Sequence, residues 1–526
     1  MFSALGNSKR NKKYFTDYSI MKNKFSSTSS IWLEQELPKF EPLSSDIETD
    51  ICIIGGGITG LTSAYLLSFH GKKIIIIDQQ DIGMGETSRT TAHITNAIDD
   101  RYAEIEKLHG EKSSLLAAQS QTEAINTIEK IVNSENIDCD FKRVDGYLFF
   151  NPDQLDEFKE EFDAALRAGV KVEMEVKSPL DCFANYSVLK FYSQAQFHSL
   201  KYLNGLITRI QQNKCLLFGH TRATEIKDGE IVEVKTENGF TIRAKDVIVA
   251  TNTPISDYVS IHLKQAAYRT YVVCYEINKG SIPEALYWDN EEPYHYIRTF
   301  TNGRKTYLII GGEDHKTGQE ENPEERFDCL EKWSNENFKD LGKLKYRWSG
   351  QVMEPADGLS FIGKDPENNQ HVYIATGDSG MGITHGTFSA LILTDLILGK
   401  DNPWAELYDP KRITLKAAPE YIKEGINTLS QYADLLTPGD VSDVIEIGRG
   451  EGSILRNGLD KVAVYKDSHG KIYKFSALCT HLKCVVQWNS VEKTWDCPCH
   501  GSRFSATGEV INGPAISNLE EYKKKL

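Results

Sequence analysis

Two short boxes rich in cysteine and histidine, both within the last fifty residues, constrain the fold of this 526-residue chain most strongly. The boxes are Cys479-Thr-His481-Leu-Lys-Cys484 and, after fifteen residues counted from His481, Cys497-Pro-Cys499-His500-Gly-Ser502. The ligand set alone is compatible with a tetrahedral zinc site of two cysteines and two histidines. Zinc sites, however, usually take both cysteines from one box and both histidines from the other, whereas here each box supplies one of each. The spacing therefore favours a different metal centre.

The two boxes resemble the Rieske [2Fe–2S] domain, in which two thiolates hold one iron and two imidazoles hold the other. The resemblance implies iron ligands Cys479, His481, Cys497 and His500, a disulfide between Cys484 and Cys499, and a bond from Ser502 to a bridging sulfide. Residues 508–515 (GEVINGPA) match the loop that covers such a cluster, and the alternating runs of 444–475 predict a small antiparallel β domain. Lys483 and Phe504 replace a glycine and a tyrosine of the high-potential relatives, so we expect a potential in the middle of the Rieske range.

A glycine-rich turn near the N-terminus predicts a second cofactor site. Residues 50–60 (DICIIGGGITG) form an apolar run that leads into a G-x-G-x-x-G turn made by Gly55, Gly57 and Gly60. An apolar helix is expected next, followed by a strand that closes on Asp78. Such glycines allow the backbone to approach a diphosphate, the helix start stabilises its charge, and the acid binds a ribose. The order predicts a dinucleotide site without deciding between FAD and NAD.

Later segments favour FAD. Residues 85–91 (GETSRTT), the strand-like runs 245–251 and 372–377, and residues 377–386 (GDSGMGITHG) resemble the D-amino-acid oxidase-like flavoproteins over about residues 48–400. The resemblance adds these cofactor-binding candidates: Gly85, Ser88, Arg89, Gly377, Gly380, Gly382 and Thr384. Amino-acid-oxidising relatives commonly carry Gly-x-Arg-Pro, with the arginine placed for the substrate carboxylate, where this chain has Gly350-Gln351-Val352-Met353, so a simple amino-acid substrate is in doubt.

The predicted fold class is α/β with a Rossmann-like FAD-binding domain, an interleaved antiparallel substrate domain and a small all-β Rieske domain. Two or three domains suit a chain of this length. The expected pieces are an N-terminal extension, partly disordered (1–47), FAD pieces (48–140, 215–260, 345–405), substrate pieces (141–214, 261–344), a linker helix (406–437) and the Rieske domain (438–526).

The predicted substrate domain contains aromatic and basic residues that are candidates for catalysis. They are Arg269, Tyr271, Tyr294, His295 and Arg298. An arginine facing the flavin would hold a carboxylate. The alternative is that the tyrosines pack within a sheet and the arginines form surface pairs. His93 and His385 lie near predicted flavin loops, although single histidines are more often structural.

Composition narrows the class of partner and the location. The formal net charge of −15 disfavours a nucleic acid, and no apolar run approaches membrane-spanning length. Six of the ten cysteines are scattered outside the boxes, which is typical of reduced thiols in a cytoplasmic protein. Residues 1–30 lack the apolar core of a secretory signal. We expect a cytoplasmic protein, and the sequence does not predict an oligomeric state.

The two cofactors together predict a FAD-dependent oxidoreductase. In the favoured interpretation, a small-molecule amine or amino acid derivative is dehydrogenated, and electrons pass one at a time through the Rieske cluster. An external one-electron carrier would then take them from the partly exposed histidine end of the cluster. One alternative is a reductase that runs in the reverse direction from an electron carrier, and the other is a non-enzymatic redox sensor.

Overall fold

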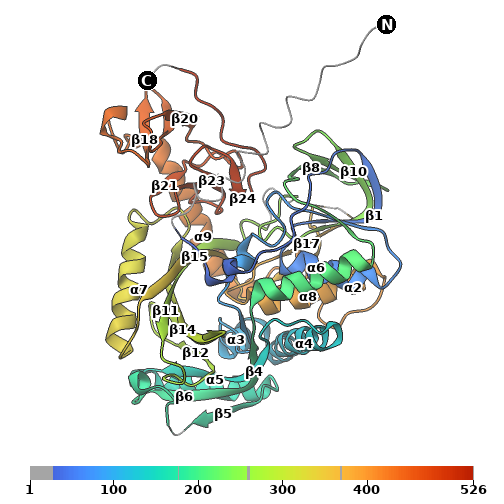
Figure 1. Cartoon of the computed structure of the whole chain (residues 1–526), viewed down its shortest axis with the longest axis vertical. Helices are drawn as coiled ribbons and strands as arrows, with labels where there is room; N and C mark the ends of the chain where they lie inside the picture. Colours follow the sequence, from blue (N-terminus) through green and yellow to red (C-terminus); the bar gives the residue numbers. More distant parts are fainter. Residues whose placement is uncertain (1–27, 176, 257–260, 368–369, 525–526) are drawn as a thin grey trace.

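The structure is a computed structural model that describes residues 28–175, 177–256, 261–367 and 370–524. Two large sheets form the body of the molecule, and the C-terminal region (residues 438–524) adds two small sheets against one side of it (Figure 1).

The first large sheet has the strand order β16-β17-β10-β1-β2-β7, with β9 on β10 and β8 on β9. Its strands are β1 Ile47–Ile54, β2 Ile74–Ile77, β7 Leu216–Phe218, β8 Ala223–Lys227, β9 Val232–Thr236, β10 Thr241–Val249, β16 Phe361–Lys364 and β17 Val372–Thr376. The strands from β17 to β7 are parallel. All four isoleucines of β2 are buried, because helices and loops cover both faces of a parallel sheet.

Helices pack around this sheet and against one another. They are α2 Ile58–Ser68, α3 Tyr102–His109, α4 Glu111–Glu135, α6 Ser199–Gln212 and α8 Gly382–Ile397. The helix α2 contacts both α6 and α8, and α8 also contacts α4. Because α2 follows the glycine-rich turn and α8 follows β17, both helices begin at the same edge of the sheet. That edge is where a ligand binds in folds of this kind.

The second large sheet has the order β15-β11-β14-β13-β12-β4-β6-β3, with β5 paired to β6. Its strands are β3 His93–Ile94, β4 Lys142–Phe150, β5 Val172–Glu175, β6 Ser187–Gln196, β11 Gln265–Ile277, β12 Leu286–Asp289, β13 His295–Asn302, β14 Lys305–Lys316 and β15 Leu344–Pro355. The pairs are antiparallel except for β12 with β4. Two more helices, α5 Leu155–Arg167 and α7 Pro323–Asn337, pack on this sheet.

The C-terminal region is all β and follows helix α9 Ala418–Gln431. One sheet contains β18 Glu451–Asn457, β19 Asp460–Lys466 and β20 Ile472–Ser476, and the other contains β21 Gln487–Asn489, β22 Thr494–Asp496, β23 Arg503–Ser505 and β24 Val510–Asn512. Short 3₁₀ turns occur at η1 Ile31–Glu34, η2 Glu86–Ser88, η3 Pro152–Gln154, η4 Asp181–Phe183, η5 Leu415–Ala417, η6 Tyr432–Leu435 and η7 Val444–Glu446. No helix of the described ranges is long and apolar enough to cross a membrane.

Sheet membership differs from the predicted pieces at two boundaries. The strand β15 pairs with β11 in the second sheet, although the piece from 345 was assigned to the FAD domain. The helix α6 packs on α2 beside the first sheet, although it lies in a predicted substrate piece. A short chain segment can leave one sheet for the other without any change in its sequence pattern, so the motifs could not place these ends. The division into two such domains stays a prediction.

Part of the predicted N-terminal extension packs tightly on the body. The indole of Trp32 is completely buried, and its Nε1 donates to the carbonyl of Thr90 at 2.5 Å. The hydroxyl of Thr28 donates to the carboxylate of Glu492 in the C-terminal region. Residues 1–27, on which the prediction of disorder mainly rested, lie outside the described residues.

Candidate functional site

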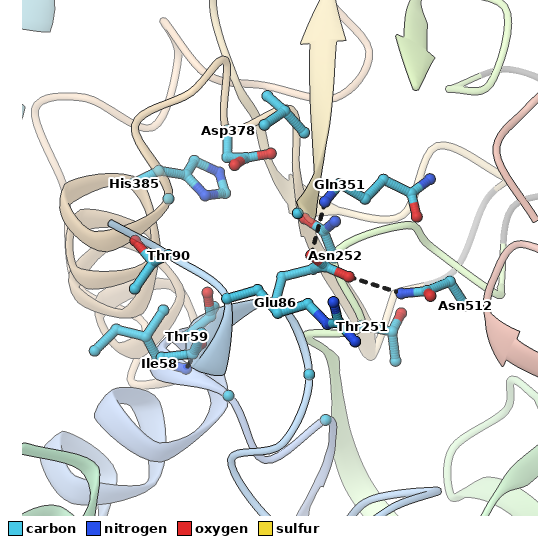
Figure 2. A pocket seen from close by; sticks show the side chains of 18 of the residues that line it. Ile58, Thr59, Glu86, Thr90, Thr251, Asn252, Gln351, Asp378, His385 and Asn512 are labelled. Atoms are coloured by element: carbon cyan, nitrogen blue, oxygen red, sulfur yellow. Dashed lines mark hydrogen bonds between the residues drawn. The ribbon is translucent and has the colours of Figure 1, made fainter. Parts of the chain in front are cut away.

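A cavity of about 240 Å³, the central cavity, opens between the two large sheets. Its walls include the glycine-rich turn, the loop of residues 85–91 and the start of α8 (Figure 2). Seven of the predicted cofactor-binding residues line it: Gly55, Gly57, Asp78, Gly85, Arg89, Gly380 and Gly382. The other four, Gly60, Ser88, Gly377 and Thr384, lie behind the lining. Their part in cofactor binding stays a prediction. A Cβ at Gly60 would collide with the carbonyl of Gly55.

The glycine-rich turn fits the diphosphate of a dinucleotide. Gly55 has φ +108°, and a Cβ there would collide with the carbonyl of Ala250. Gly57 immediately precedes α2, so the positive end of this helix, where the N–H of Ile58 donates to the hydroxyl of Thr87 at 3.1 Å, faces the cavity. The carboxyl of Asp78 is fixed by the N–H groups of Gly56 and Gln80, each at 2.8 Å. Burial raises the pKa of Asp78 to about 6 although both bonds oppose that shift.

The four predicted cluster ligands meet between two loops of the C-terminal region. Cys479, Cys497 and His500 are buried, His481 is half-buried, and the imidazoles of His481 and His500 have ring centroids 5.1 Å apart. Both ring nitrogens of His500 are buried without a hydrogen-bond partner, and burial lowers the pKa of this histidine to about 3. Two adjacent thiols and a neutral imidazole with unused nitrogens are the donors that a [2Fe–2S] cluster of this type requires.

The remaining predicted features of the cluster site lie around these ligands. Cys484 and Cys499 form a disulfide, and the sulfur of Cys497 lies within 4.8 Å of both disulfide sulfurs. The hydroxyl of Ser502 accepts a hydrogen bond from the N–H of Ala515 at 3.0 Å. Lys483, at the position where relatives have glycine, has φ +63°, which explains why glycine suits this position.

One loop of the C-terminal region forms part of the wall of the central cavity. Its lining residues are Ile511, Asn512, Gly513, Ala515 and Ile516. The amide of Asn512 donates to Glu86 at 3.1 Å, and the backbone N–H of Gln351 donates to the same carboxylate at 2.7 Å (Figure 2). Because Ala515 also contacts Ser502, a single loop separates the cavity from the cluster ligands.

Further contacts fix the cluster loops against the body. The side chain of Gln351 donates to the carbonyl of Gly501 at 2.9 Å, and that of Gln319 donates to the carbonyl of Pro498 at 3.1 Å. A Cβ at Gly501 would collide with both Ala267 and the Gln351 amide. The fit therefore requires glycine at position 501.

The histidine end of the cluster site faces the body, and the prediction that it is partly exposed to an external carrier is wrong for His500. His500 is 4% exposed. The ring of His262 lies against both ligand imidazoles, with centroids 5.1 Å from His481 and 5.9 Å from His500. The motif identifies the ligands, but it contains no information about a residue more than two hundred positions away that packs on them.

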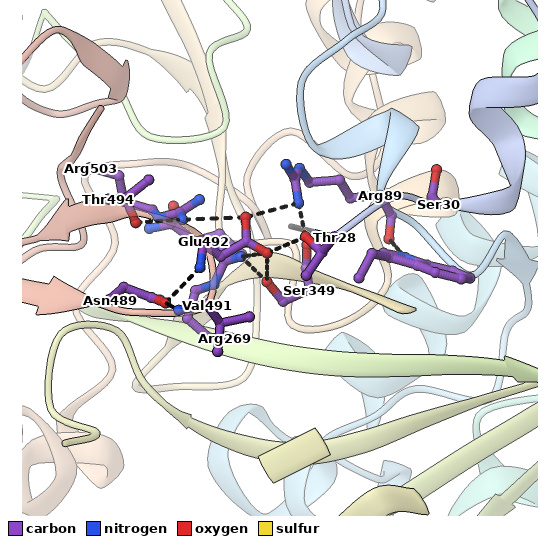
Figure 3. A network of polar contacts seen from close by, with 12 residues as sticks. Thr28, Ser30, Arg89, Arg269, Ser349, Asn489, Val491, Glu492, Thr494 and Arg503 are labelled. Atoms are coloured by element: carbon purple, nitrogen blue, oxygen red, sulfur yellow. Dashed lines mark hydrogen bonds and ion pairs between the residues drawn. The ribbon is translucent and has the colours of Figure 1, made fainter. Parts of the chain in front are cut away.

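A buried carboxylate, Glu492, connects the C-terminal region to the body (Figure 3). It follows β21 and lies near three guanidinium groups, at 3.4 Å from Arg89, 4.0 Å from Arg269 and 3.8 Å from Arg503. Ser349 donates to it at 2.9 Å. Burial alone would raise the pKa of this carboxyl, but the three guanidinium groups lower it to about 2. We call these five residues the Glu492 network.

Of the five predicted catalytic residues, the structure brings Tyr294 to the central cavity and directs the other four elsewhere. Arg269 belongs to the Glu492 network, and Tyr271 bonds His315 at 2.9 Å. Thr270, between them, lines the cavity. Side chains of a strand alternate between its faces, so choosing 269 and 271 selected the wrong face of β11.

His295 and Arg298 have structural partners instead of a place in the cavity. His295 bonds Asp289 at 2.9 Å and stacks on Trp333 with ring centroids 3.9 Å apart. The guanidinium of Arg298 donates to four backbone carbonyls, including that of Ala92 at 2.6 Å. The sequence reasoning missed the residues that do line this part of the cavity: Asp99, Thr270, Trp288, Tyr296, Asp314, Glu354 and Asp378. They come from separate loops and strands and have no shared motif.

Comparison with known proteins agrees with this geometry. The family model described as FAD dependent oxidoreductase matches residues 50–396, and the model described as Rieske [2Fe-2S] domain matches residues 439–523. The chain is 32% identical over 493 residues to the Putative Rieske 2Fe-2S iron-sulfur protein YhfW of Bacillus subtilis (strain 168), covering 92% of this chain and 96% of that protein. Both predicted resemblances are confirmed, as is the mixed α/β fold class.

Two further similarities concern the larger part of the chain. It is 24% identical to the Gamma-glutamylputrescine oxidoreductase of Escherichia coli (strain K12), over 69% of this chain and 86% of that protein. The crystal structure of glycine oxidase from Geobacillus kaustophilus matches with a TM-score of 0.58 at 16% identity, over 70% of this chain and 99% of that chain. The second similarity shows a shared fold.

Proposed function

The chain belongs to the FAD dependent oxidoreductase family and carries a Rieske [2Fe-2S] domain, so it is an enzyme with FAD and a [2Fe–2S] cluster as cofactors, and we propose that it is a dehydrogenase of an amine or amino acid derivative. Its electrons leave one at a time through the cluster to an external one-electron carrier. The observation that carries this proposal is the shared loop, whose residues 511–513, 515 and 516 line the cavity while Ala515 contacts Ser502 at the cluster site.

The residues of the chain divide the work of holding the two cofactors. The glycine backbone at 55–57 and the start of α2 bind the diphosphate, and Asp78 accepts from a ribose. Cys479 and Cys497 hold one iron, and His481 and His500 hold the other. FAD, when bound, would supply the hydride acceptor.

The reaction is a two-electron oxidation at a carbon next to nitrogen. The C–H bond and one N–H bond of the amine break, a C=N bond forms, and two protons and two electrons are released. Water then adds to the imine and gives a carbonyl compound and the free amine. Two one-electron carriers each take one electron, which completes the balance. The buried side chain of Gln351 donates to the carbonyl of Gly501, next to the cluster ligand His500.

Anaerobic stopped-flow spectroscopy of the purified holoenzyme tests the proposal. Addition of an amine should bleach the flavin first, and the electron paramagnetic resonance signal of the reduced cluster should follow. If a reduced one-electron carrier charges the cluster first and no amine bleaches the flavin, electrons run in the opposite direction and the dehydrogenase proposal fails. A cytoplasmic location is proposed as well, and the buried free thiols of Cys52, Cys139, Cys215 and Cys274 support it.

A further inference from the structure

The end of the central cavity formed by the second sheet is rich in carboxyl groups. Asp99 precedes α3, Asp314 lies on β14, Glu354 lies on β15, and Asp378 follows β17. All four line the cavity. A fifth carboxyl, that of Asp100, lies behind them and shares a hydroxyl with Glu354, because Ser379 Oγ is 2.5 Å from Asp100 and 2.7 Å from Glu354. Four separate segments of the chain therefore bring negative groups to one place.

These carboxyls interact with one another. Burial raises the pKa of Asp100, Asp314 and Asp378 to about 7, and it also raises the pKa of Glu354. The charge of Asp99 raises each of these pKa values further, so Asp99 is near the centre of the group. In the described ranges, none of the five forms an ion pair with lysine or arginine within 4.0 Å, although Arg101 lowers the pKa of Asp99 through space. A positive ligand would relieve this repulsion.

Aromatic rings line the cavity beside the carboxyls. They belong to Trp288, Tyr294 and Tyr296. The hydroxyl of Tyr294 donates to Asp99 at 2.8 Å, and the ring centroids of Tyr294 and Tyr296 lie 5.5 Å apart. The negative faces of aromatic rings attract ammonium groups, and their apolar area packs on methylene groups. The wall thus suits an alkyl chain that ends in a cation.

His385 provides an independent sign of a ligand. Its side chain is directed into the cavity (Figure 2), and it is 5% exposed. Its Nε2 is buried without a hydrogen-bond partner. Burial lowers the pKa of this histidine to about 4, so at neutral pH it adds no positive charge that would repel a cation. An unpaired ring nitrogen in this position costs free energy unless a ligand bonds it.

Among the described residues that line the cavity, no arginine is free to bind a substrate carboxylate. Two arginines, Arg89 and Arg222, line it. Arg89 donates to the carbonyl of Ser349 at 2.9 Å, and Arg222 donates to the carbonyl of Ile516 at 3.0 Å and pairs with Glu237. Both guanidinium groups are therefore already engaged in holding the two parts of the protein together.

The carboxyls are also too widely spread for one metal ion. Across the described parts of the chain, one group of three His, Cys, Asp or Glu side chains has ligand atoms within 4.8 Å of one another, and it consists of Cys484, Cys497 and Cys499. A cation that reaches several separated carboxyls must itself be extended.

We propose that the substrate is a straight-chain diamine or longer polyamine, bound through its ammonium groups by Asp99, Asp314, Glu354 and Asp378, with no carboxylate at the flavin end. The inference rests on the proposed function insofar as the bound cation is the molecule that is oxidised. Binding itself does not require turnover, so the two can be tested separately.

The test is a titration of the anaerobic holoenzyme with three probes of similar length: 1,4-diaminobutane, butylamine and 4-aminobutanoate. A shift of the flavin absorption bands reports binding, and bleaching reports oxidation. The diamine should bind at least about tenfold more tightly than butylamine, which corresponds to about 1.4 kcal/mol for the added charge pair in a partly desolvated site. The third probe, 4-aminobutanoate, should bind most weakly.

Variants locate the binding charge. Asp99→Asn and Asp314→Asn should each weaken binding of the diamine by about tenfold and that of butylamine by less. Asp328→Asn removes the same charge from the exposed surface of α7 and should leave both affinities unchanged. The wild-type comparison of the three probes decides the question even if a variant does not fold.

The outcomes separate this inference from the proposed function. A shift without bleaching by the diamine supports the cation site but overturns the diamine as the substrate, and the proposed function then fails only if no other amine bleaches the flavin. Binding of 4-aminobutanoate as tight as that of the diamine overturns the inference, even if an amine bleaches the flavin. No response to the diamine, or affinities unchanged in both folded, FAD-containing variants, overturns it too.

Discussion

Replacing Glu492 by glutamine is the most direct perturbation of the interface between the C-terminal region and the body of the protein. Glu492 is 2% exposed as a residue, and the guanidinium of Arg269 is completely buried with Nε and Nη1 unpaired. The pKa of Glu492 is about 2 in the fold, against its ordinary value of 4.5. One pKa unit corresponds to about 1.4 kcal/mol, so the charge contributes about 3 kcal/mol at neutral pH. Removal of one partner of a buried ion pair typically costs about 3–5 kcal/mol, and this range agrees with the value derived from the pKa shift.

The pH dependence follows from the direction of the shift. Because the pKa is lowered in the fold, the stabilisation is complete above pH 4.5 and is lost as the pH falls from 4.5 toward 2. The difference between wild type and Glu492→Gln should therefore be constant from about pH 6 to 8 and shrink below pH 4.5.

Urea titration of the holoenzyme, followed by the visible circular dichroism of the cluster, measures the effect. With an m value of about 1–3 kcal/mol/M for a small domain, the midpoint should fall by about 1–3 M at pH 7. Glu520→Gln is the matched control, since Glu520 pairs with Lys483 while 70% exposed, and it should cost less than about 1 kcal/mol. Equal midpoints for Glu492→Gln and Glu520→Gln would refute the assigned role of the Glu492 network.

Three other predictions concern single residues of the two sites. Ser502→Ala removes the hydroxyl that the Rieske resemblance implies as a donor to a bridging sulfide, so it should lower the midpoint potential of the cluster. A redox titration monitored by electron paramagnetic resonance measures this, and an unchanged potential would contradict the implied role. Gly55→Ala introduces a Cβ against the carbonyl of Ala250, so the purified protein should lose flavin absorbance and keep the cluster signal. Full FAD occupancy in this variant would refute the role of the glycine-rich turn in binding the diphosphate. Gly501→Ala should slow electron transfer from flavin to cluster without slowing flavin bleaching, because the added Cβ collides with Ala267 and Gln351. Equal slowing of both rates would contradict this prediction.

The features that could be predicted from the sequence are those that local chemistry dictates. The disulfide joins Cys484 to Cys499 as the resemblance implied, and the turn at Gly55 has the backbone conformation that glycine permits. In each case the residues that act together are close in the chain or belong to a strict spacing, so the pattern itself carries the information.

The candidate site was harder to predict because it is assembled from distant segments. Neighbouring residues of β11 point to opposite faces of the sheet, so a shift of one residue decides whether Arg269 or Thr270 is predicted to line the cavity. A bulge in β11 between 269 and 271 interrupts this alternation. Glu492 lies in an ordinary polar turn, and only its packing against Arg89 and Arg269 gives it a role. Charge composition could not locate the carboxyls at 99, 314, 354 and 378 either, since acidic residues are common throughout the chain.

The interface between the C-terminal region and the body also determines how electrons can leave the cluster. Besides the contacts of Glu492, hydrogen bonds of Gln79, Arg222, Gln319, Gln351 and Asn512 connect the C-terminal region to the body. At about 0.5–1.5 kcal/mol each, and with about 3 kcal/mol from Glu492, separation costs roughly 6–10 kcal/mol. Fewer than about one molecule in ten thousand would be separated at any time. A Rieske domain that swings out to meet its carrier is therefore not expected here. With His500 enclosed against His262, we expect electrons to leave on the side of His481, the one predicted ligand that keeps partial exposure.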